Sequence, residues 1–393
     1  MDNNNEEDLN ETIKELANSP NILSVLENVI QDRGFAGTAD IPKLVYLTLL
    51  TGMLEKPVSL VLKGPSGSGK SFSMNMGKQF IPPVAYEQFE GMSEKALVYL
   101  KDLNLKHKHL VIGEASGMAE GNGRTLLRQL LTEGSVRYAT VQSTDKHGLE
   151  GSELPTLEGP TGLLMTTTAE RLHPEDESRM LSVELKDSPE LIEEALLAQA
   201  LGTNRNLAPL NTDAWFGLYG QISEGPKDVE IPFAAEIARG LPTTHDRIKR
   251  DFPHVLSLIK AHALLHSATR GRNEDGAVIA AIGDYEAVKD LVNEPISQGL
   301  QVAVADTIRA VVEAVQSLRK HPNHYVSQAA LSESLKRDQS VISRSVKQAV
   351  DLGYLVDSNP GQGRASQLSL GERKLPARLA LPDLSAAEPV TAG

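Results

Sequence analysis

Five short apolar runs stand in the first half of the chain, and segments with a helical or mixed pattern separate them. Each run is short and mainly apolar or aromatic at its ends, and is suited to a buried strand of a parallel sheet. The runs are Val58–Leu62, Ala85–Phe89, His109–Ile112, Gly162–Met165 and Met180–Leu185. The pattern therefore predicts an α/β fold with a doubly wound parallel sheet.

The connection between the third and fourth runs has a different pattern. Val136–Val141 (VRYATV) alternates between apolar and polar side chains, and the polar stretch Gln142–Glu153 leads on towards Leu154–Leu157. Alternation with a period of two is typical of a half-exposed strand. We therefore expect a β-hairpin inserted ahead of the fourth strand.

Helical patterns fill much of the remaining chain. Residues 12–34 predict short helices, and the region from Ser188 to about Gly299 is helical, most clearly in Val255–His266 (VLSLIKAHALLH). A separate unit with its own helices begins at Asp306. These segments give the sheet the covering helices that a parallel sheet requires and add a further domain.

The first strand is followed by a glycine-rich turn and a helix start, in VSLVLKGPSGSGKSFSMNM. The turn fits the pattern of a phosphate-binding P-loop, whose glycines let successive backbone N–H groups converge on phosphate oxygens. We expect Lys70 to reach the β- and γ-phosphates of ATP and the Ser71 hydroxyl to bind Mg²⁺. The alternative is a Gly- and Ser-rich loop with a chance lysine. The predicted cofactor-binding residues are Gly64, Pro65, Ser66, Gly67, Ser68, Gly69, Lys70 and Ser71.

A P-loop ATPase also needs a carboxylate at the end of a neighbouring strand, to orient the attacking water and hold the metal's shell. In LVIGEASGM the third run ends at Ile112, and Gly113 and Glu114 follow. Glu114 is the candidate general base, and a surface Glu after a core strand is the alternative. Gly113 stands where an Asp often binds the metal through water. Either metal affinity is weak, therefore, or another acid such as Glu120 compensates.

Two more polar positions follow along the chain. Thr167, in the run of threonines after the fourth strand, is suited to hold the lytic water against the γ-phosphate; the alternative is an ordinary helix N-cap. Arg179 precedes the fifth strand in PEDESRMLSVEL. It is suited to neutralise transition-state charge in a neighbouring subunit, as an arginine finger does. The alternative is a surface ion pair with Glu175 or Glu177.

The unit that begins at Asp306 has the element order of a winged helix. Val326–Leu335 and Gln339–Leu352 predict a helix-turn-helix, and the alternating stretch Tyr354–Leu370 with its Gly, Asn and Pro turn predicts the wing. Short polar and basic side chains near the start of a recognition helix enter the major groove. Here these are Ser343, Arg344 and Lys347. Winged helices also dock proteins, so both DNA contact and docking are open at this point.

Composition narrows the classes of function. The chain has no cysteine, which removes disulfides and thiolate chemistry and is compatible with the cytoplasm. No apolar run is long enough to span a bilayer, so we expect no membrane partner. The net charge of −13 argues against nucleic-acid binding, but residues 301–376 hold ten Lys and Arg against seven Asp and Glu. That local excess is compatible with a phosphate-binding face.

Taken in order, the P-loop, Glu114, the inserted hairpin, the threonine-ended strand and Arg179 resemble an AAA+ ATPase of the helicase clade. Residues about 20–190 are similar to the ATPase modules of phage- and mobile-element-encoded primase-helicase proteins. The stretches that carry this likeness are LVLKGPSGSGKS, LKHKHLVIGEASGM, LLRQLLTEGSVRYAT and GLLMTTTAERLHPEDESRMLSVEL. The stretch RIKRDFPHVLSLIKAHALLH, followed by DYEAVKDLV, resembles the helical lid of minichromosome-maintenance-type helicases.

The resemblance gives the predicted segments their names. They are an acidic, helical N-terminal segment (1–36), an AAA+ P-loop ATPase core (37–190), a helical lid (191–300), a winged-helix domain (301–374) and a disordered tail (375–393).

The same resemblance implies roles for further residues. Arg250 matches the sensor-2 arginine that reaches the γ-phosphate, with Arg247 as its competitor and a solvated helix end as the alternative. Family members form rings, commonly hexamers, with the hairpin in the central channel, which implies a homo-oligomer on single-stranded DNA. Lys146 and His147 would then lie at the hairpin tip and Arg137 at its base, where phosphate electrostatics dominate the grip. A solvated loop is the alternative for these residues.

These expectations combine into an ATP-dependent DNA helicase or translocase that uses ATP and Mg²⁺ in the replication of a phage or mobile element. The alternative is a DNA-binding ATPase switch, such as a regulator, loader or defence component, that does not unwind DNA. A metabolic kinase fits the P-loop but not the hairpin or the winged helix.

Overall fold

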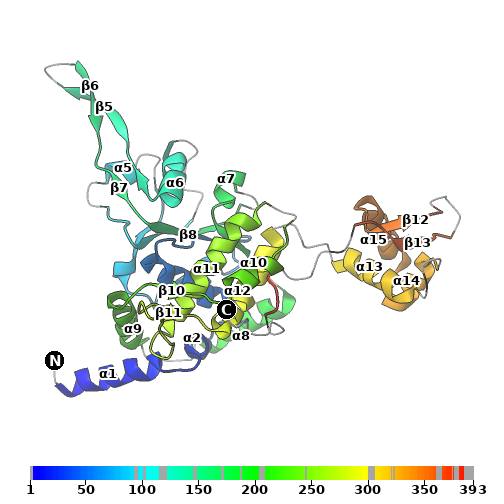
Figure 1. Ribbon diagram of the computed structural model, residues 1–393, viewed down its shortest axis with the longest axis horizontal. Coiled ribbons are helices and arrows are strands. Elements are labelled where there is room, and N and C mark those ends of the chain that lie inside the picture. Colours follow the sequence, from blue (N-terminus) through cyan, green and yellow to red (C-terminus); the bar gives the residue numbers. More distant parts are fainter. Residues whose placement is uncertain are drawn as a thin grey trace. The chain divides into compact units, whose positions relative to one another are not determined.

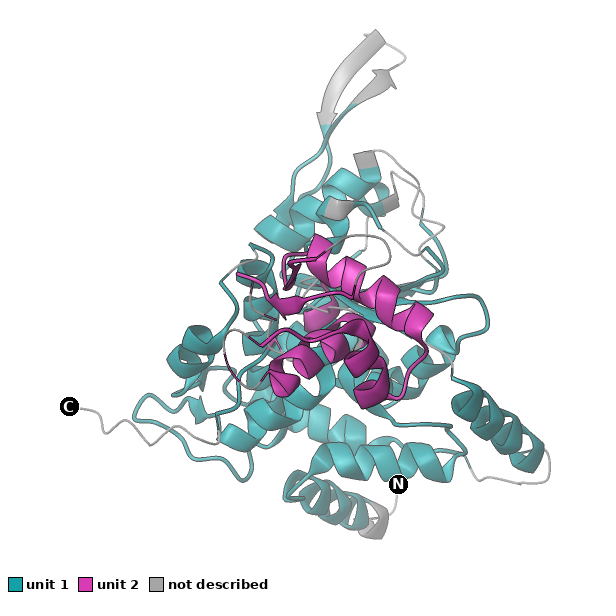
Figure 2. Ribbon diagram, turned by 90° about the vertical axis from the view of Figure 1, so that its right-hand side faces the viewer, with its two compact units in different colours: residues 1–296, 381–393 teal, residues 297–380 magenta. Residues whose placement is uncertain are grey.

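The structure is a computed structural model of the 393-residue chain. It describes residues 3–92, 96–100, 103–114, 122–144, 148–169, 172–185, 188–202, 209–243, 246–299, 306–319, 321, 324–359, 365–373, 375 and 380–384. The chain forms two compact units, coloured separately in Figure 2: residues 1–296 with 381–393, and residues 297–380.

The first unit is built around a five-stranded sheet with the strand order β2-β3-β8-β1-β9, in which every neighbouring pair is parallel. Its strands are β1 Leu60–Lys63, β2 Tyr86–Phe89, β3 Lys108–Ile112, β8 Thr161–Thr167 and β9 Leu181–Glu184. Each of the five predicted runs forms one of these strands, so the predicted α/β fold with a parallel sheet is confirmed. All of β1 and β8 is buried, as expected for strands covered on both faces.

Parallel pairing brings the carboxyl ends of these strands to one edge of the sheet. β1 lies between β8 and β9, with Lys63 opposite Thr167 on one side and Glu184 on the other. β3 lies on the far side of β8, with Ile112 opposite Met165. The turn after β1, the end of β8 and the residues after β3 therefore meet at the same edge.

Helices cover the sheet (Figure 1). Helix α6 (Asn122–Glu133) supplies Leu127 and Leu130 to a buried cluster that also contains Leu110 and Leu163 from the sheet. Helix α3 (Asp40–Leu50) packs tightly on α4 (Lys70–Lys78), the helix that follows the glycine-rich turn. A Cβ atom at Gly77 of α4 would lie 2.3 Å from the carbonyl oxygen of Pro42, so only glycine allows this approach.

The inserted hairpin is present. β5 (Ala139–Thr144) pairs antiparallel with β6 (Gly148–Glu153), in a register that runs from Ala139 opposite Glu153 to Thr144 opposite Gly148. At its base β4 (Ser135–Val136) pairs with β7 (Leu157–Glu158). The two long strands lie side by side and extend away from the central sheet in Figure 1.

The other helices of the first unit are α1 Asn3–Ala17, α2 Ile22–Asp32, α5 Ala96–Tyr99, α7 Pro174–Glu177, α8 Pro189–Gly202, α9 Asp213–Glu224, α10 Ala234–Gly240, α11 Ile248–Leu265 and α12 Ile282–Gly299. Four short elements complete its description: the 3₁₀ helices η1 Thr51–Met53 and η2 Pro83–Ala85, and the parallel pair β10 Val229–Glu230 with β11 Val278–Ile279. The helical region is joined to the core through Trp215 of α9, whose ring packs edge-on against Phe80 and Tyr46 at centroid distances of 5.0 and 5.7 Å.

Residues 380–384 differ from the loose tail predicted from residue 375. Ala380 and Leu381 are each 2% exposed. The Leu381 N–H donates to the side-chain oxygen of Asn293 at 3.0 Å, and the Tyr285 hydroxyl donates to the Pro382 carbonyl at 2.6 Å. An Ala- and Pro-rich composition predicts a loose tail, but apolar burial and these hydrogen bonds fix this piece against α12.

The second unit is a small helical domain with a two-stranded sheet. Its elements are α13 Asp306–Leu318, α14 Gln328–Leu335, α15 Gln339–Asp351, β12 Leu355–Asp357 and β13 Leu368–Leu370. β12 and β13 pair antiparallel, and Val326 pairs with Leu368 beside them. Val315, Leu331 and Val346 are buried in its core. Among the described residues of the whole chain, no helix is long and apolar enough to cross a membrane.

Candidate nucleotide site and DNA-facing elements

The turn Gly64–Ser71 joins the end of β1 to the first residue of α4. Gly67 and Gly69 have φ angles of +89° and +76°, in the left-handed region that favours glycine. Gly69 is the N-cap of α4 and has no side chain to cap it, so the first N–H groups of that helix are left for another acceptor. A strand, a curled glycine loop and an uncapped helix start form an anion-binding geometry.

Lys70 is buried in this loop. Its side chain is folded back, and Nζ donates to the carbonyl oxygens of Gly64 at 2.8 Å and Pro65 at 2.6 Å, with the residue 6% exposed. Both acceptors are uncharged, so these bonds orient the ammonium group without neutralising it. A buried charge is normally paired. Ser71 is exposed next to it, and its hydroxyl is therefore accessible to a metal held by phosphates.

The ends of three strands are tied together around the loop. The Gly64 N–H donates to the Thr167 carbonyl at 3.3 Å, which links β1 to β8. The Thr166 hydroxyl donates to the Gly113 carbonyl, which links β8 to β3. These bonds fix the backbone that precedes Glu114 relative to the phosphate loop.

Thr167 itself is used within the chain. Its side chain is 3% exposed, and its hydroxyl accepts a hydrogen bond from the Ala169 N–H at 3.1 Å. This contact is a local turn between a side chain and the backbone two residues on, and it is not the helix N-cap that the sequence left as the alternative to a role in holding water, because α7 begins only at Pro174. The Thr167 backbone nevertheless lies beside the loop, through its bond to Gly64.

Glu114 is the second residue after β3 and is partly exposed. Its Oε1 atom is buried and has no hydrogen-bond partner among the described residues. A buried carboxylate oxygen without a partner is rare in folded proteins, and a water or a cation is the usual explanation. Glu120, the other acid considered for the metal, lies outside the described residues.

The residues at this edge of the sheet are of the types that a magnesium–nucleotide site uses. Within the described ranges no group of three or more His, Asp or Glu side chains could hold a metal ion on its own. A metal here would need phosphates to supply part of the coordination sphere, with the protein adding a hydroxyl and one or two carboxylates. Ser71, the unpartnered oxygen of Glu114 and the uncapped start of α4 fit such a shared site.

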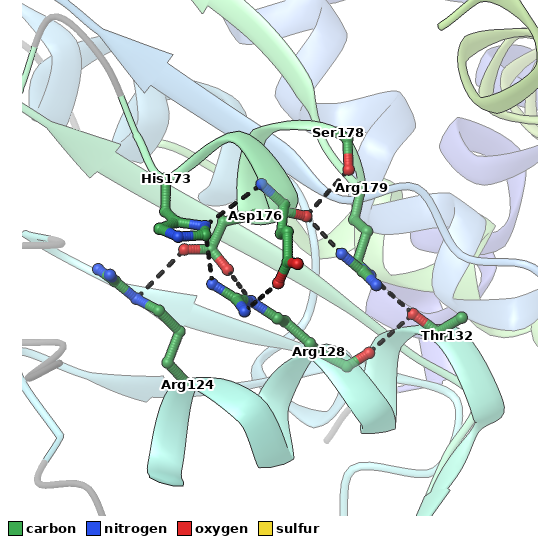
Figure 3. Close-up of polar contacts among 8 residues, drawn as sticks. Arg124, Arg128, Thr132, His173, Asp176, Ser178 and Arg179 are labelled. Atoms are coloured by element: carbon green, nitrogen blue, oxygen red, sulfur yellow. Dashed lines mark hydrogen bonds and ion pairs between the residues drawn. The ribbon is translucent and has the colours of Figure 1, made fainter. Parts of the chain in front are cut away.

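Arg179 lies in a network of arginines and acids (Figure 3). Its Nε donates to the Thr132 hydroxyl on α6 at 3.0 Å, and its Nη1 donates to the Glu175 carbonyl oxygen at 2.5 Å. The predicted alternative, an ion pair with a Glu175 or Glu177 carboxylate, is not what these contacts show. Because both acceptors are uncharged, the Arg179 guanidinium is oriented while its charge stays available.

The acids beside Arg179 are paired with other cations. Asp176 is 9% exposed and lies between Arg124, at 3.2 Å, and Arg128, both from α6. The Asp176 hydrogen bond raises the pKa of Arg128. Arg128 also bonds Glu175 at 2.5 Å. The sequence interpretation missed this cluster, although the four-residue spacing of Arg124 and Arg128 does place them on one helix face.

A second missed contact joins this segment to the phosphate loop. Lys63, the last residue of β1, is 7% exposed and forms an ion pair with Glu177 at 2.5 Å. Glu177 belongs to α7, two residues before Arg179. The segment that carries Arg179 is thus fixed both to α6 and to the strand that begins the loop.

The two arginines considered for the sensor-2 role are in different surroundings. Arg247 Nε donates to Asp251 at 3.2 Å, and that carboxylate is 1% exposed. Burial raises the pKa of Asp251, and the charge of Arg247 opposes this rise. Arg250 is exposed in the first turn of α11. Arg247 is therefore used in an ion pair within α11 and its N-terminal end, and Arg250 is the better candidate for the sensor-2 role.

Of the three hairpin residues predicted to contact DNA, the structure describes Arg137, and this residue forms an ion pair. Arg137 donates from Nε and Nη2 to Glu153 Oε1, at 2.8 and 2.5 Å, and both side chains are more than half exposed. Such exposed pairs contribute little and exchange readily. Lys146 and His147, predicted for the hairpin tip, lie outside the described residues.

In the second unit, Ser343, Arg344 and Lys347 are exposed on α15. Asp338 caps the start of that helix by accepting the Ser340 N–H at 2.9 Å. Ser343 and Lys347 line a groove of about 470 Å³ that also contains Asp351. The groove therefore offers acceptors as well as a cation.

Comparison of the chain with protein-family models gives no match, and comparison with curated proteins gives no significant match.

Proposed function

We propose that this chain is an ATP-binding and ATP-hydrolysing P-loop protein of the AAA+ type. The observation that carries the proposal is the buried ammonium group of Lys70, the first residue of a helix without a side-chain cap. It donates to the Gly64 and Pro65 carbonyl oxygens and has no carboxylate partner in the part of the chain that the structure describes. The triphosphate of a nucleotide supplies the anion that this arrangement lacks. The backbone N–H groups of the loop and Lys70 would bind its phosphate oxygens.

The residues at the strand ends divide the chemistry between them. Ser71 and the carboxylates of the site would hold Mg²⁺, which when bound neutralises phosphate charge. Glu114 would accept the proton of the attacking water, because its unpartnered oxygen lies at the end of a strand tied to the loop. Thr167 would position the loop through its carbonyl, a role that the contact with Gly64 supports.

We further propose that Arg179 acts on the nucleotide of a neighbouring subunit in a homo-oligomer, a hexamer by resemblance. Support comes from its two uncharged acceptors, which aim the guanidinium without cancelling its charge. The charge is then available for transition-state phosphate oxygens. Arg250 would approach the γ-phosphate from the helical lid.

DNA would be the substrate of the assembly. Arg137, Lys146 and His147 of the hairpin would contact the phosphates of a single strand. We propose that the second unit is a winged helix, with α14 and α15 as its helix-turn-helix and β12 and β13 as its wing. Ser343, Arg344 and Lys347 would then face duplex DNA. The exposed position of all three on α15 supports this assignment.

The first candidate activity is ATP-dependent unwinding of DNA or translocation along it, in replication of a phage or mobile element. A DNA-binding ATPase switch that does not unwind DNA is the second. One observation favours the switch: Arg137 is paired with Glu153, so a DNA strand at the hairpin base would meet a carboxylate beside the cation, although this exposed pair is weak.

Strand displacement on a forked duplex distinguishes the two activities. For the motor we expect ATP-dependent displacement by the wild type and none by Glu114→Gln, whose turnover should fall by about 10²- to 10⁴-fold while ATP still binds. ATP hydrolysis and DNA binding without displacement would identify the switch. Wild-type hydrolysis rates in Glu114→Gln would contradict the assignment of the general base.

A further inference from the structure

The position in front of Glu114 has no side chain, and a neighbouring strand fills the space. Gly113 and Glu90 follow β3 and β2 at equivalent points, because Ile112 pairs with Phe89 and the Gly113 N–H donates to the Phe89 carbonyl at 3.2 Å. A Cβ atom built on Gly113 would lie 2.7 Å from Glu90 Oε2 and 3.7 Å from its Cδ. The Glu90 carboxylate therefore lies where a side chain at residue 113 would otherwise extend.

This carboxylate is oriented by its neighbours on the same strand. The Gln88 side-chain amide donates to Glu90 Oε1 at 3.1 Å, and Lys78 of α4 donates to the Gln88 side-chain oxygen. With Oε1 used in this way, Oε2 is the atom nearest to Gly113. Lys78 is the last residue of α4, the helix that begins at Lys70 and Ser71. Burial lowers the pKa of Lys78 and the nearby charge of Glu90 opposes this, so the Glu90 carboxylate also lies close to this helix.

Magnesium at a phosphate site keeps several water ligands and needs carboxylates to accept hydrogen bonds from them. A P-loop site with glycine at residue 113 lacks one such acceptor. We propose that Glu90, reaching across from β2, supplies the metal-facing carboxylate of this site, and that Gly113 is required because it leaves room for Glu90. The inference rests on the proposed nucleotide site. It assigns metal retention to Glu90 and leaves water activation to Glu114.

Glu87 provides a matched control on the same strand. It is three residues earlier, and its carboxylate is paired with Lys108 at 2.6 Å. Removing its charge disturbs an ion pair of β2 and β3 but not the space beside Gly113. A difference between the Glu90 and Glu87 variants therefore reports the position of the charge rather than the stability of the strand.

The test measures ATP affinity by calorimetry, once with Mg²⁺ and once with EDTA, in wild type, Glu90→Gln and Glu87→Gln. We expect Mg²⁺ to tighten ATP binding by the wild type and by Glu87→Gln. In Glu90→Gln this gain should shrink by about tenfold, with binding in EDTA unchanged, as for loss of an outer-shell metal partner. Electron paramagnetic resonance of Mn²⁺ added with ATP gives an independent readout of the bound metal.

A relocated carboxylate sharpens the test. Glu90→Ala removes the atom that a residue-113 side chain would meet, and φ at Gly113 is not positive, so aspartate is compatible there. In Glu90→Ala, Mg²⁺ should no longer tighten ATP binding as it does in the wild type. In the double variant Glu90→Ala/Gly113→Asp this tightening should return.

The outcomes separate this inference from the proposed function. The role of Glu90 is overturned, while nucleotide binding stands, by either of two results. One is that Mg²⁺ tightens ATP binding by Glu90→Gln as much as by the wild type. The other is that the effect of Mg²⁺ shrinks equally in Glu87→Gln. Failure of the double variant to recover, with its fold intact by circular dichroism, also counts against it. If the wild type binds no ATP in either buffer, both the nucleotide site and the role of Glu90 fall together.

Discussion

The lysine and arginine side chains around the strand ends of the first unit differ in the atoms that they contact. Lys63, Arg124 and Arg128 meet carboxylates and are neutralised inside the chain. Among the described residues, Lys70 and Arg179 donate to uncharged oxygens. The first set connects the segment that follows β8 to β1 and α6. The second set has no carboxylate partner among the described residues, and this difference in partners is what supports the proposed roles of Lys70 and Arg179 toward phosphate.

A buried histidine gives a prediction at the same scale. His109 on β3 is fully buried with Nε2 3.0 Å from the Val58 carbonyl. Burial lowers the pKa of His109, and the hydrogen bond to the Val58 carbonyl opposes this effect, so that the pKa is about 4. The unfolded chain, with a histidine pKa near ~6.5, then takes up the proton first as the pH falls. Stability is therefore complete above about pH 6.5 and is lost as the pH falls towards 4.

Wild type and His109→Gln should differ in this pH dependence. Between pH 7.5 and 5.5 the unfolding free energy of the wild type should fall by about 1.4 kcal/mol more than that of His109→Gln, measured by urea denaturation. Any cost of the substitution that is independent of pH cancels in this comparison. Parallel pH profiles would show that His109 does not remain neutral in the folded chain.

The sequence predicted the role of a residue only where the residues that act together are close in the sequence. The loop Gly64–Ser71 was recognisable because its chemistry is contiguous. The Lys63–Glu177 pair joins residues 114 positions apart, and the Arg128–Asp176 pair joins residues 48 apart. Glu90 was missed for the same reason, since only the pairing of β2 with β3 places it beside Gly113. No local pattern contains such information.

At the scale of elements, the contact between α3 and α4 holds the helix that begins at the phosphate loop. Alanine normally stabilises a helix interior relative to glycine by about 0.5–1 kcal/mol. At Gly77, however, the added Cβ would meet the Pro42 carbonyl at 2.3 Å, and that backbone atom cannot turn away. Gly220 in α9 has no atom within 4 Å of the same position.

The two glycines should therefore respond in opposite directions. We expect Gly77→Ala to destabilise the chain by roughly 1–3 kcal/mol, as overpacking does, and Gly220→Ala to stabilise it by about 0.5–1 kcal/mol. Urea denaturation of both variants gives the comparison. Equal effects would mean that α3 and α4 are not in such close contact.

The elements themselves were predictable where their periodicity is long enough to detect. The five sheet strands coincide with the five predicted runs, and the first hairpin strand overlaps the alternating stretch Val136–Val141, so the sheet and the hairpin were both found. The parallel pair β10 and β11 escaped, because strands of two residues carry no periodic signal. The helices α14 and α15 of the second unit lie close to the predicted ranges Val326–Leu335 and Gln339–Leu352, and the side chains of Ser327 and Asp338 cap their starts.

At the scale of the whole molecule, the chain does not pass through its units in simple order. The second unit spans residues 297–380, close to the predicted 301–374, but the chain then returns to the first unit. Leu381 bonds Asn293, 88 positions earlier, and Ala- and Pro-rich composition does not reveal such a contact. The acidic first part, at −15 for residues 1–300, and the basic 301–376 are thus charge-separated parts of one protein.

The central claim is that a nucleotide triphosphate binds in the loop around Lys70. Calorimetric titration of Mg²⁺–ATP into wild type and Lys70→Ala tests it most directly, with Glu114→Gln as a variant that should keep binding. Loss of one partner of a buried charge contact costs about 2–5 kcal/mol, so Lys70→Ala should bind ATP roughly 100-fold more weakly or not at all. Equal ATP affinity in wild type and Lys70→Ala would contradict the account.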